Sequence, residues 1–181
     1  MKHIALYLLF VLFSINGFAQ HNINIGAGYF GHTLTYPGLV AEFELEKTIS
    51  EQVSLPIRAD IGFYHHTRYH TGIFLDVNVG HRRYYQSGWF YEQSIGVGVL
   101  ASVLNSDGVY KVDEEGQVSD ASRLNPIEFM PSITLGGGYD LSKEQNRRKL
   151  IWLRPKVFWQ YPHKNASTFN VALQLGFTHT I

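Results

Sequence analysis

Histidine is the residue type in this chain best placed for chemistry at a surface. The segment His65-His66-x-x-x-His70 brings three imidazoles close together in the sequence. Imidazole nitrogens are common ligands of zinc, copper and nickel ions. If this segment is the tip of a hairpin, His65, His66 and His70 form a candidate metal site, which His32 or His163 could complete. The same histidines are also compatible with an ordinary polar loop.

Acyl-transfer or hydrolytic chemistry would need a serine or a carboxylate beside a histidine. The nearest ingredients in the sequence are His65, His66, Asp60, Ser102 and Ser106. No nucleophile elbow of the form G-x-S-x-G is present, and no serine and histidine stand at a spacing typical of a catalytic pair. We therefore expect no catalytic residues, no enzymatic activity and no cofactor.

Charged residues at even-numbered positions form the largest group of candidate site residues. Because they alternate with apolar residues, they share one face of their segments. They could line a polar path, or they could form a salt-bridged network that fills an interior. Buried charges persist only when they are paired, so we expect the network, with Glu42, Glu44 and Glu46 close to Arg58. Its expected members are Glu42, Glu44, Glu46, Arg58, Asp60, Asp76, Arg82, Glu92, Arg154 and Lys156.

The elements that carry these residues are predicted to be β-strands, because apolar and polar residues alternate with a period of two between turn signals. In the final segment, for example, Phe169, Val171, Leu173, Leu175 and Phe177 share one face. Most segments exceed the roughly five or six residues usual in soluble sheets. The eight predicted strands span 22–32, 39–49, 53–65, 71–85, 88–104, 126–141, 149–161 and 169–181.

The two faces of these segments differ in polarity and size. The odd-numbered face is mainly apolar, whereas the even-numbered face combines the charges with glycines such as Gly26, Gly96 and Gly136. A ring of eight strands has a narrow interior, which suits glycine and paired charges better than rows of Phe, Trp and Ile. The apolar face is therefore expected to point outward, the reverse of a soluble lipocalin-like barrel.

Aromatic residues gather near both ends of the predicted strands, as expected for side chains at the two interfaces of a membrane. A sheet in lipid must also close, because an open edge would leave backbone groups unpaired. The pattern predicts an all-β fold, an eight-stranded antiparallel up-and-down transmembrane β-barrel. The interface aromatics are Trp89, Tyr91, Tyr139 and Phe177 near one set of strand ends, and Tyr29, Phe63, Phe129, Trp159, Tyr161 and Phe169 near the other.

Residues 1–19 have the form of a secretory signal peptide. Lys2 and His3 precede an apolar run to Phe13, and small residues follow up to Ala19. The run is shorter than the roughly 20 apolar residues of a spanning helix. We expect cleavage after Ala19 or after Gln20, which leaves residues 20–181 as one barrel domain.

Composition excludes several classes of protein. The chain contains no cysteine, so disulfides, thiol catalysis and cysteine-bound metal are ruled out. Its 15 basic and 15 acidic residues cancel, so nucleic acid is not an expected partner. With an even number of strands both ends lie on one side. Short turns near 50–52, 86–87 and 142–148 then face the periplasm, and connections at 31–38, 66–70, 105–125 and 162–167 face outward.

In its signal peptide, alternating strands and closing segment, the chain resembles the small eight-stranded outer-membrane β-barrel proteins of Gram-negative bacteria, of the OmpA-like and OmpX-like type. Family members often end in an aromatic residue, whereas here Ile181 is last and Phe177 precedes it by four positions. The resemblance implies a monomer in the outer membrane without a wide pore, in contact with lipids, lipopolysaccharide included, and with the outer-membrane assembly machinery. Its outer connections would serve a structural, adhesive or ligand-binding role. The alternative functions are a lipid-A-modifying enzyme and a soluble lipocalin-like carrier.

Overall fold

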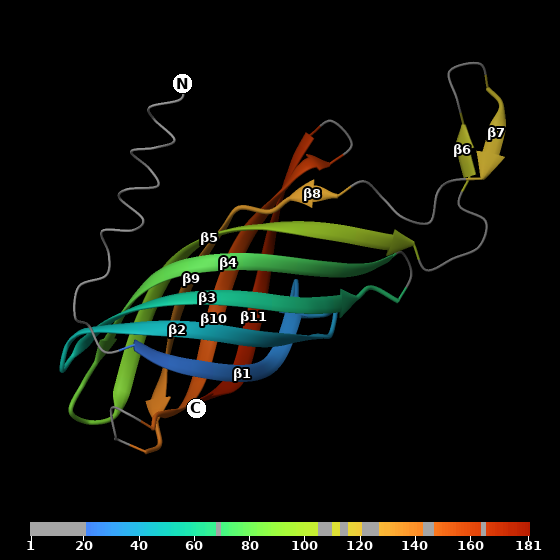
Figure 1. Cartoon of the computed structure of the whole chain (residues 1–181). Helices are drawn as coiled ribbons and strands as arrows, with labels where there is room; N and C mark the ends of the chain where they lie inside the picture. Colours follow the sequence, from blue (N-terminus) through green and yellow to red (C-terminus); the bar gives the residue numbers. More distant parts are fainter. Residues whose placement is uncertain are drawn as a thin grey trace, which may run out of the picture.

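The structure is a computed structural model that describes residues 21–67, 70–104, 110–112, 116–120, 127–142, 147–163 and 166–181. The expected signal peptide lies outside the described residues. Over these ranges the chain forms strands, and none of it is a helix long and apolar enough to cross a membrane. The strands are β1 (His21–His32), β2 (Gly38–Ser50), β3 (Val53–His65), β4 (His70–Tyr84), β5 (Trp89–Leu104), β6 (Tyr110–Val112), β7 (Val118–Asp120), β8 (Glu128–Phe129), β9 (Ser132–Asp140), β10 (Lys149–His163) and β11 (Ala166–Thr180) (Figure 1).

Strands form where the sequence alternates. β3 is the clearest case, because outward and buried residues alternate along the whole of Val53–His65, the range predicted from the sequence. The observed ends of β1, β2, β4 and β5 lie within one residue of the predicted ends. β10 and β11 extend beyond their predicted ranges toward the connection that joins them, so this hairpin is longer than expected.

The predicted count of eight strands is wrong in one place. The segment 126–141 contains two strands, β8 and β9, so the main sheet has nine strands. The break lies at Met130-Pro131, because proline has no N–H to donate to a strand ladder. Both strands pair with β5 and β10, so they share one position in the sheet. A separate two-stranded ribbon, β6 with β7, lies within the long connection that was expected to be a loop.

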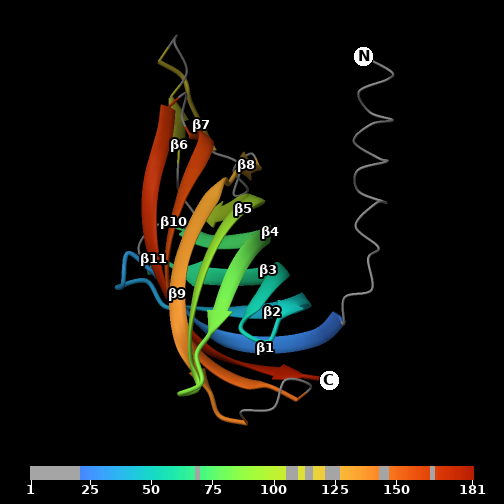
Figure 2. The same ribbon diagram turned by 90° about the vertical axis from the view of Figure 1, so that its left-hand side faces the viewer.

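Followed from each strand to its neighbour, the strand pairings lead back to the first strand. β11 pairs with both β1 and β10, and β9 pairs with both β5 and β10, always antiparallel. We refer to this arrangement as the ring. In Figures 1 and 2 the strands β1 to β5 lie on one side of it and β9, β10 and β11 on the other, around a common interior.

The ring is staggered. Register partners followed from Ala27 through β2, β3, β4, β5 and β8 lead to Tyr161 on β10, whereas those followed through β11 lead to Ile151. From Ile151 to Tyr161 the stagger is ten residues. With eight positions around the ring, this stagger corresponds to a strand tilt of roughly 40°.

The two ends of the ring differ. We call the end with the connections after β1, β3 and β10 the loop end, and the opposite end the turn end. At the turn end Gly88 adopts a φ of 93° in the β4–β5 turn, which favours glycine. At the loop end the β1–β2 turn instead holds Thr33 and Leu34 at φ values of 46° and 64°. Left-handed backbone at residues with a side chain is strained.

The two faces of the ring are arranged as predicted. Among the described residues, every large exposed hydrophobic except Leu34 is odd-numbered. All ten members of the expected network are buried, as are Glu128 and Asp140. The prediction that the apolar face points outward is therefore confirmed, and this is the reverse of a soluble lipocalin-like barrel.

Glycines on the inner face make room for the largest interior side chains. A Cβ atom added at Gly176 would lie 2.4 Å from the Trp152 ring, and one added at Gly28 would lie 2.8 Å from it. A Cβ atom at Gly136 would lie 2.6 Å from Arg154 Cγ. The sequence places glycine where Trp152 and Arg154 need the space.

Candidate functional site

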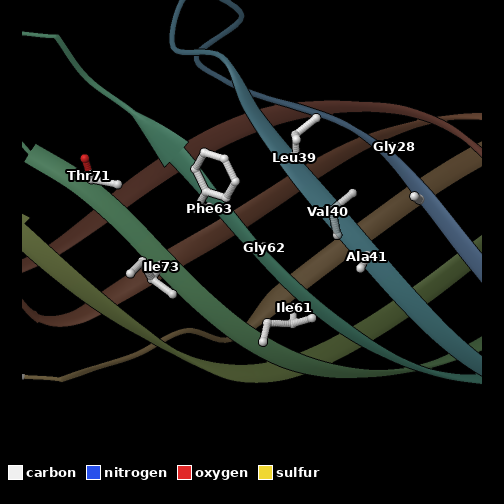
Figure 3. A pocket seen from close by; sticks show the side chains of 10 residues that line it. Gly28, Leu39, Val40, Ala41, Ile61, Gly62, Phe63, Thr71 and Ile73 are labelled. Atoms are coloured by element: carbon white, nitrogen blue, oxygen red, sulfur yellow. The ribbon is translucent and has the colours of Figure 1, made fainter.

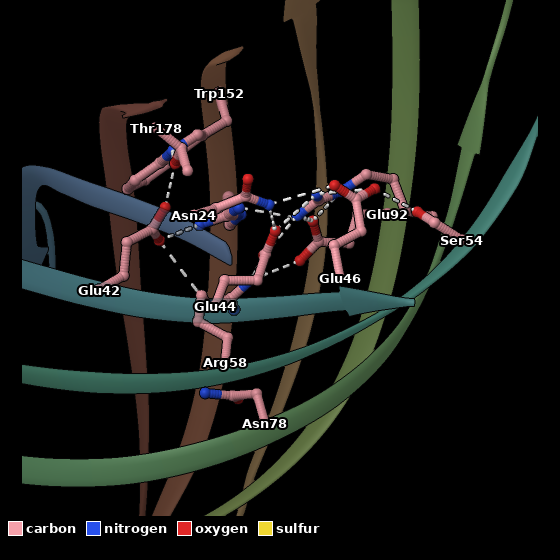
Figure 4. A network of polar contacts seen from close by, with 12 residues as sticks. Asn24, Glu42, Glu44, Glu46, Ser54, Arg58, Asn78, Glu92, Trp152 and Thr178 are labelled. Carbon is pink, nitrogen blue, oxygen red and sulfur yellow. Dashed lines mark hydrogen bonds and ion pairs between the residues drawn. The ribbon is translucent and has the colours of Figure 1, made fainter. Parts of the chain in front are cut away.

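The interior charges converge on Glu92 of β5. Its carboxylate accepts hydrogen bonds from Arg58 Nη1 at 2.6 Å, from Arg82 Nη2 at 2.6 Å and from Arg154 Nη2 at 3.4 Å. The three arginines belong to β3, β4 and β10, so one acid joins four strands (Figure 4). Each of these side chains is at most 1% exposed. Pairing of this kind offsets the cost of removing ionised groups from water.

A second contact joins strands that are not neighbours. Arg82 Nη1 and Nη2 on β4 donate to the two oxygens of Glu44 on β2, at 2.8 and 2.7 Å. β3 lies between β2 and β4 in the sheet, so this bidentate pair reaches over one strand on the inner face of the ring. Asn24 of β1 donates to the same carboxylate at 2.9 Å, which adds a further strand to the network.

Arg154 connects strands that lie three positions apart in the ring. Its Nη1 donates to Glu42 Oε2 at 2.6 Å, and its guanidinium carbon lies 4.1 Å from the centre of the Trp152 ring. Trp152 Nε1 donates to the Thr178 hydroxyl at 2.7 Å, and Thr178 in turn donates to Glu42. Glu42 is therefore held from β10 and from β11, and β11 is the strand that closes the ring against β1.

Lys156 and Asp60 complete the charged layer toward the loop end. Lys156 Nζ of β10 donates to Asp76 Oδ2 of β4 at 2.5 Å, again across the interior. Asp60 accepts from Arg58 Nε at 3.0 Å and from Asn78 Nδ2 at 3.1 Å. The charges on opposite walls are thus joined directly by side chains.

The expected proximity of the three glutamates to Arg58 is met for two of them. Arg58 lies 3.8 Å from Glu42 and 3.9 Å from Glu44, although its shortest contacts are with Asp60 and Glu92. Glu46 contacts Arg82 instead, at 3.5 Å. The sequence suggested partners on the next strand, whereas the shortest contacts of Arg58 are with Asp60 on its own strand and with Glu92 on β5, beyond the adjacent strand β4.

Several interior residues of the network were not singled out by sequence reasoning. Ser54 donates to Glu46 at 2.5 Å, and the Tyr84 hydroxyl donates to Glu46 at 2.7 Å. The Arg148 guanidinium carbon lies 3.4 Å from the centre of the Tyr84 ring, and Arg148 Nη1 lies 3.7 Å from Asp140 Oδ2. All of these residues are even-numbered, so the parity of their positions was the signal that could have found them.

The chain was compared with known proteins in sequence and in structure. No protein-family model matches it, and no curated protein matches it in sequence. Its structure is similar to the crystal structure of Neisserial surface protein A (NspA), with a TM-score of 0.57 and 8% sequence identity over 89% of this chain and 96% of that chain. The fold is that of a small outer-membrane β-barrel. The N-terminal β-barrel domain of Pseudomonas aeruginosa OprF also matches, with a TM-score of 0.42 and 12% identity over 88% of this chain and 98% of that chain.

The three histidines of the candidate metal site are not brought together. The ring centres of His66 and His70 lie 5.9 Å apart, and both are partly buried. His65 is exposed on the outer face, where its Nδ1 lies 3.0 Å from Thr71 Oγ1. No group of three or more His, Cys, Asp or Glu residues within the described ranges is placed to hold a metal ion. The side chain of His163 lies outside the described residues.

The inner histidines belong to an aromatic layer at the loop end of the barrel. His32 stacks on Tyr64 with ring centres 4.4 Å apart, and its Nε2 lies 3.1 Å from Asn170 Oδ1. Tyr36, from the strained β1–β2 turn, lies 3.9 Å from the His66 ring. This layer covers the charged network on the side of the loop end.

The residues that sequence reasoning offered for catalysis lie apart. Asp60 and Ser102 are buried on the inner face, whereas His65 is exposed on the outer face. Asp60 is engaged by Arg58 and Asn78. Ser106 lies outside the described residues.

The predicted interface aromatics lie on the outer face. Trp89 is 60% exposed and Tyr161 is 58% exposed. Trp89 and Tyr139 form an edge-to-face pair at the turn end, with ring centres 5.4 Å apart. Trp159 and Tyr161 lie near the loop end of β10, while Tyr91 and Phe177 are exposed on β5 and β11 near the turn end.

Proposed function

We propose that the chain is an integral β-barrel protein of a Gram-negative outer membrane that has a structural, adhesive or ligand-binding role and no enzymatic activity. One observation carries the proposal: the apolar residues of the strands face outward and the charged residues face inward. In water this arrangement would expose a continuous apolar wall, which soluble monomers avoid. In lipid the same wall is the favourable surface.

The buried network argues against a wide pore. Contacts from β10 span the interior, between Arg154 and Glu42 and between Lys156 and Asp76, and Arg82 joins Glu44 over β3. Side chains largely fill a barrel of this size. The network is then a structural plug that ties opposite walls together, and the lumen does not serve as a diffusion channel.

We infer that the interactive part of the protein is the loop end. The connections there carry the β6–β7 ribbon and the elongated β10–β11 hairpin. In the proposed orientation these elements face the cell exterior, where they contact lipopolysaccharide and a ligand or partner. The barrel itself acts as a monomer, and the assembly machinery of the outer membrane inserts it.

Flotation with lipid vesicles tests the proposal. Residues 20–181, refolded in detergent and mixed with vesicles of phosphatidylethanolamine and phosphatidylglycerol, are expected to float with the lipid and to resist extraction at alkaline pH. A chain that stays soluble and monodisperse without detergent would contradict membrane insertion. In planar bilayers the inserted chain is expected to give no large conductance steps. Lipid A of unchanged mass in cells that produce the protein is the expected result for a non-enzyme.

A further inference from the structure

The outer wall of the barrel has a carbon-lined groove across β1, β2, β3 and β4. Its volume is about 740 Å³, and its lining is almost entirely apolar (Figure 3). Two other hollows on the same wall, beside Val79 and beside Gly137, have volumes of about 340 and 470 Å³. The first groove is therefore the largest of the three.

Small residues create this groove. Ala27 on β1 and Ala41 on β2 are direct register partners, so two short side chains lie side by side on the outer face. Leu39, Phe63 and Ile73 border them toward the loop end. A pair of alanines among bulky residues leaves a notch on the outer face. An apolar chain that fills the notch gains van der Waals contacts with the surrounding side chains.

The groove runs nearly parallel to the barrel axis. The register partner of Ala27 on β4 is Leu75, and Thr71 lies four residues further toward the loop end. A row of register partners that starts on β1 and passes through β2, β3 and β4 shifts steadily toward the loop end. The stagger shows this shift, because the row reaches β10 at Tyr161 and not at Ile151. With spacings of about 4.8 Å between strands and 3.3 Å between residues, and a tilt of roughly 40°, the line from Ala27 to Thr71 rises about 20 Å and turns little around the barrel.

The direction and length of the groove indicate what kind of molecule it can bind. An acyl chain lies along the membrane normal, and one leaflet contributes about 15 Å to a hydrocarbon core of about 30 Å. The loop end of the groove meets the exposed His65, whose ring contacts Thr71 at 3.0 Å. A hydroxyl and an imidazole can donate hydrogen bonds to phosphate oxygens. The groove is apolar along its length and has polar side chains at one end. A lipid has the same arrangement, with an apolar chain and a polar headgroup.

We propose that this groove binds one acyl chain of a phosphate-bearing membrane lipid in the leaflet at the loop end, with the lipid's phosphate beside His65 and Thr71. The inference rests on the proposed function, because the outer wall must lie in lipid. It adds a specific lipid site to a wall that otherwise meets lipid without preference.

Native mass spectrometry tests this site with the mature chain reconstituted in nanodiscs of dimyristoyl phosphatidylglycerol. Ala41→Phe fills the notch and is expected to lower the fraction of protein that retains a lipid about tenfold. Val97→Phe places the same side chain on the outer face of β5, outside the groove, and is expected to retain lipid as the wild type does. Thr71→Val is expected to weaken retention less than Ala41→Phe, because it leaves the acyl contacts intact.

Equal retention by wild type, Ala41→Phe and Val97→Phe would overturn the inference. So would a dimer that Ala41→Phe dissociates, because the groove would then hold a second copy of the chain. Circular dichroism confirms that each variant keeps its strands. If the chain floats with vesicles but retention is equal, only the lipid site fails, whereas a chain that does not float refutes the proposed function as well.

Discussion

Arg82 holds Glu44 by two hydrogen bonds of 2.8 and 2.7 Å on the inner face of the barrel, although β3 separates their strands. The next residue, Arg83, is exposed on the outer face, with its guanidinium carbon 5.9 Å from the Tyr85 ring centre. Successive side chains of a strand point to opposite faces. One step along β4 therefore separates a fully buried guanidinium from an exposed one, which gives a matched pair of sites for mutation.

Arg82→Met is expected to destabilise the barrel by about 3–5 kcal/mol, because it leaves Glu44 and Glu92 without their shared counter-ion. Arg83→Met is expected to change the free energy of unfolding by at most about 0.5 kcal/mol. Urea unfolding in detergent, followed by circular dichroism, measures both. Equal losses in the two variants would show that the buried pairs do not stabilise the fold.

The space left by glycine around Trp152 is expected to be necessary for folding stability. A Cβ atom at position 176 would lie 2.4 Å from the Trp152 ring, so Gly176→Leu forces a side chain against the ring. The substitution is expected to lower the free energy of unfolding by at least about 1–3 kcal/mol. In a double variant with Trp152→Ala the cost should fall but not vanish, because the clash with the ring is removed while the 2.6 Å approach to the Ala27 backbone oxygen remains. Additive losses in the double-mutant cycle would show that the two residues do not compete for the same space.

Strands and faces were predictable because they depend on a local period of two. The range of β3 was predicted without error, and the parity of each charge was enough to place it on the inner face. The alternation does not reveal a break in the ladder, so Met130-Pro131 went unnoticed inside an otherwise alternating segment. Pro131 stands at an odd position and leaves the alternation of polar and apolar residues unchanged, because its missing N–H acts only on strand pairing.

The partners within the network were less predictable than its members. Arg154 and Glu42 are far apart in the sequence and sit on strands that do not pair, so nothing local joins them. Their contact follows from the closure and stagger of the ring. The candidate three-histidine site is not assembled within the described residues, because His65, the last residue of β3, is exposed on the outer face whereas His66 is partly buried.

The β1–β2 turn is expected to be improved by glycine. Leu34 has a φ of 64° and is 66% exposed, so Leu34→Gly removes backbone strain and little packing. The expected gain in the free energy of unfolding is about 1 kcal/mol. Thr35→Gly, at a neighbouring position without a positive φ, should give no gain. If both variants lose stability to the same extent, the turn is not strained at Leu34.

Tryptophan fluorescence can distinguish the outer wall, which is proposed to face lipid, from the interior without any added label. Trp89 is 60% exposed on the outer face, whereas Trp152 is 1% exposed and bonded to Thr178. A variant that keeps only Trp89, made by Trp152→Phe and Trp159→Phe, is expected to be quenched strongly by lipids with brominated acyl chains. The variant that keeps only Trp152 should be quenched weakly, since quenching by bromine needs close contact and the barrel wall lies between the ring and the lipid. Equal quenching would place both rings in the same environment and contradict the inward orientation of the even-numbered face. Strong quenching of Trp152 alone would reverse the two faces.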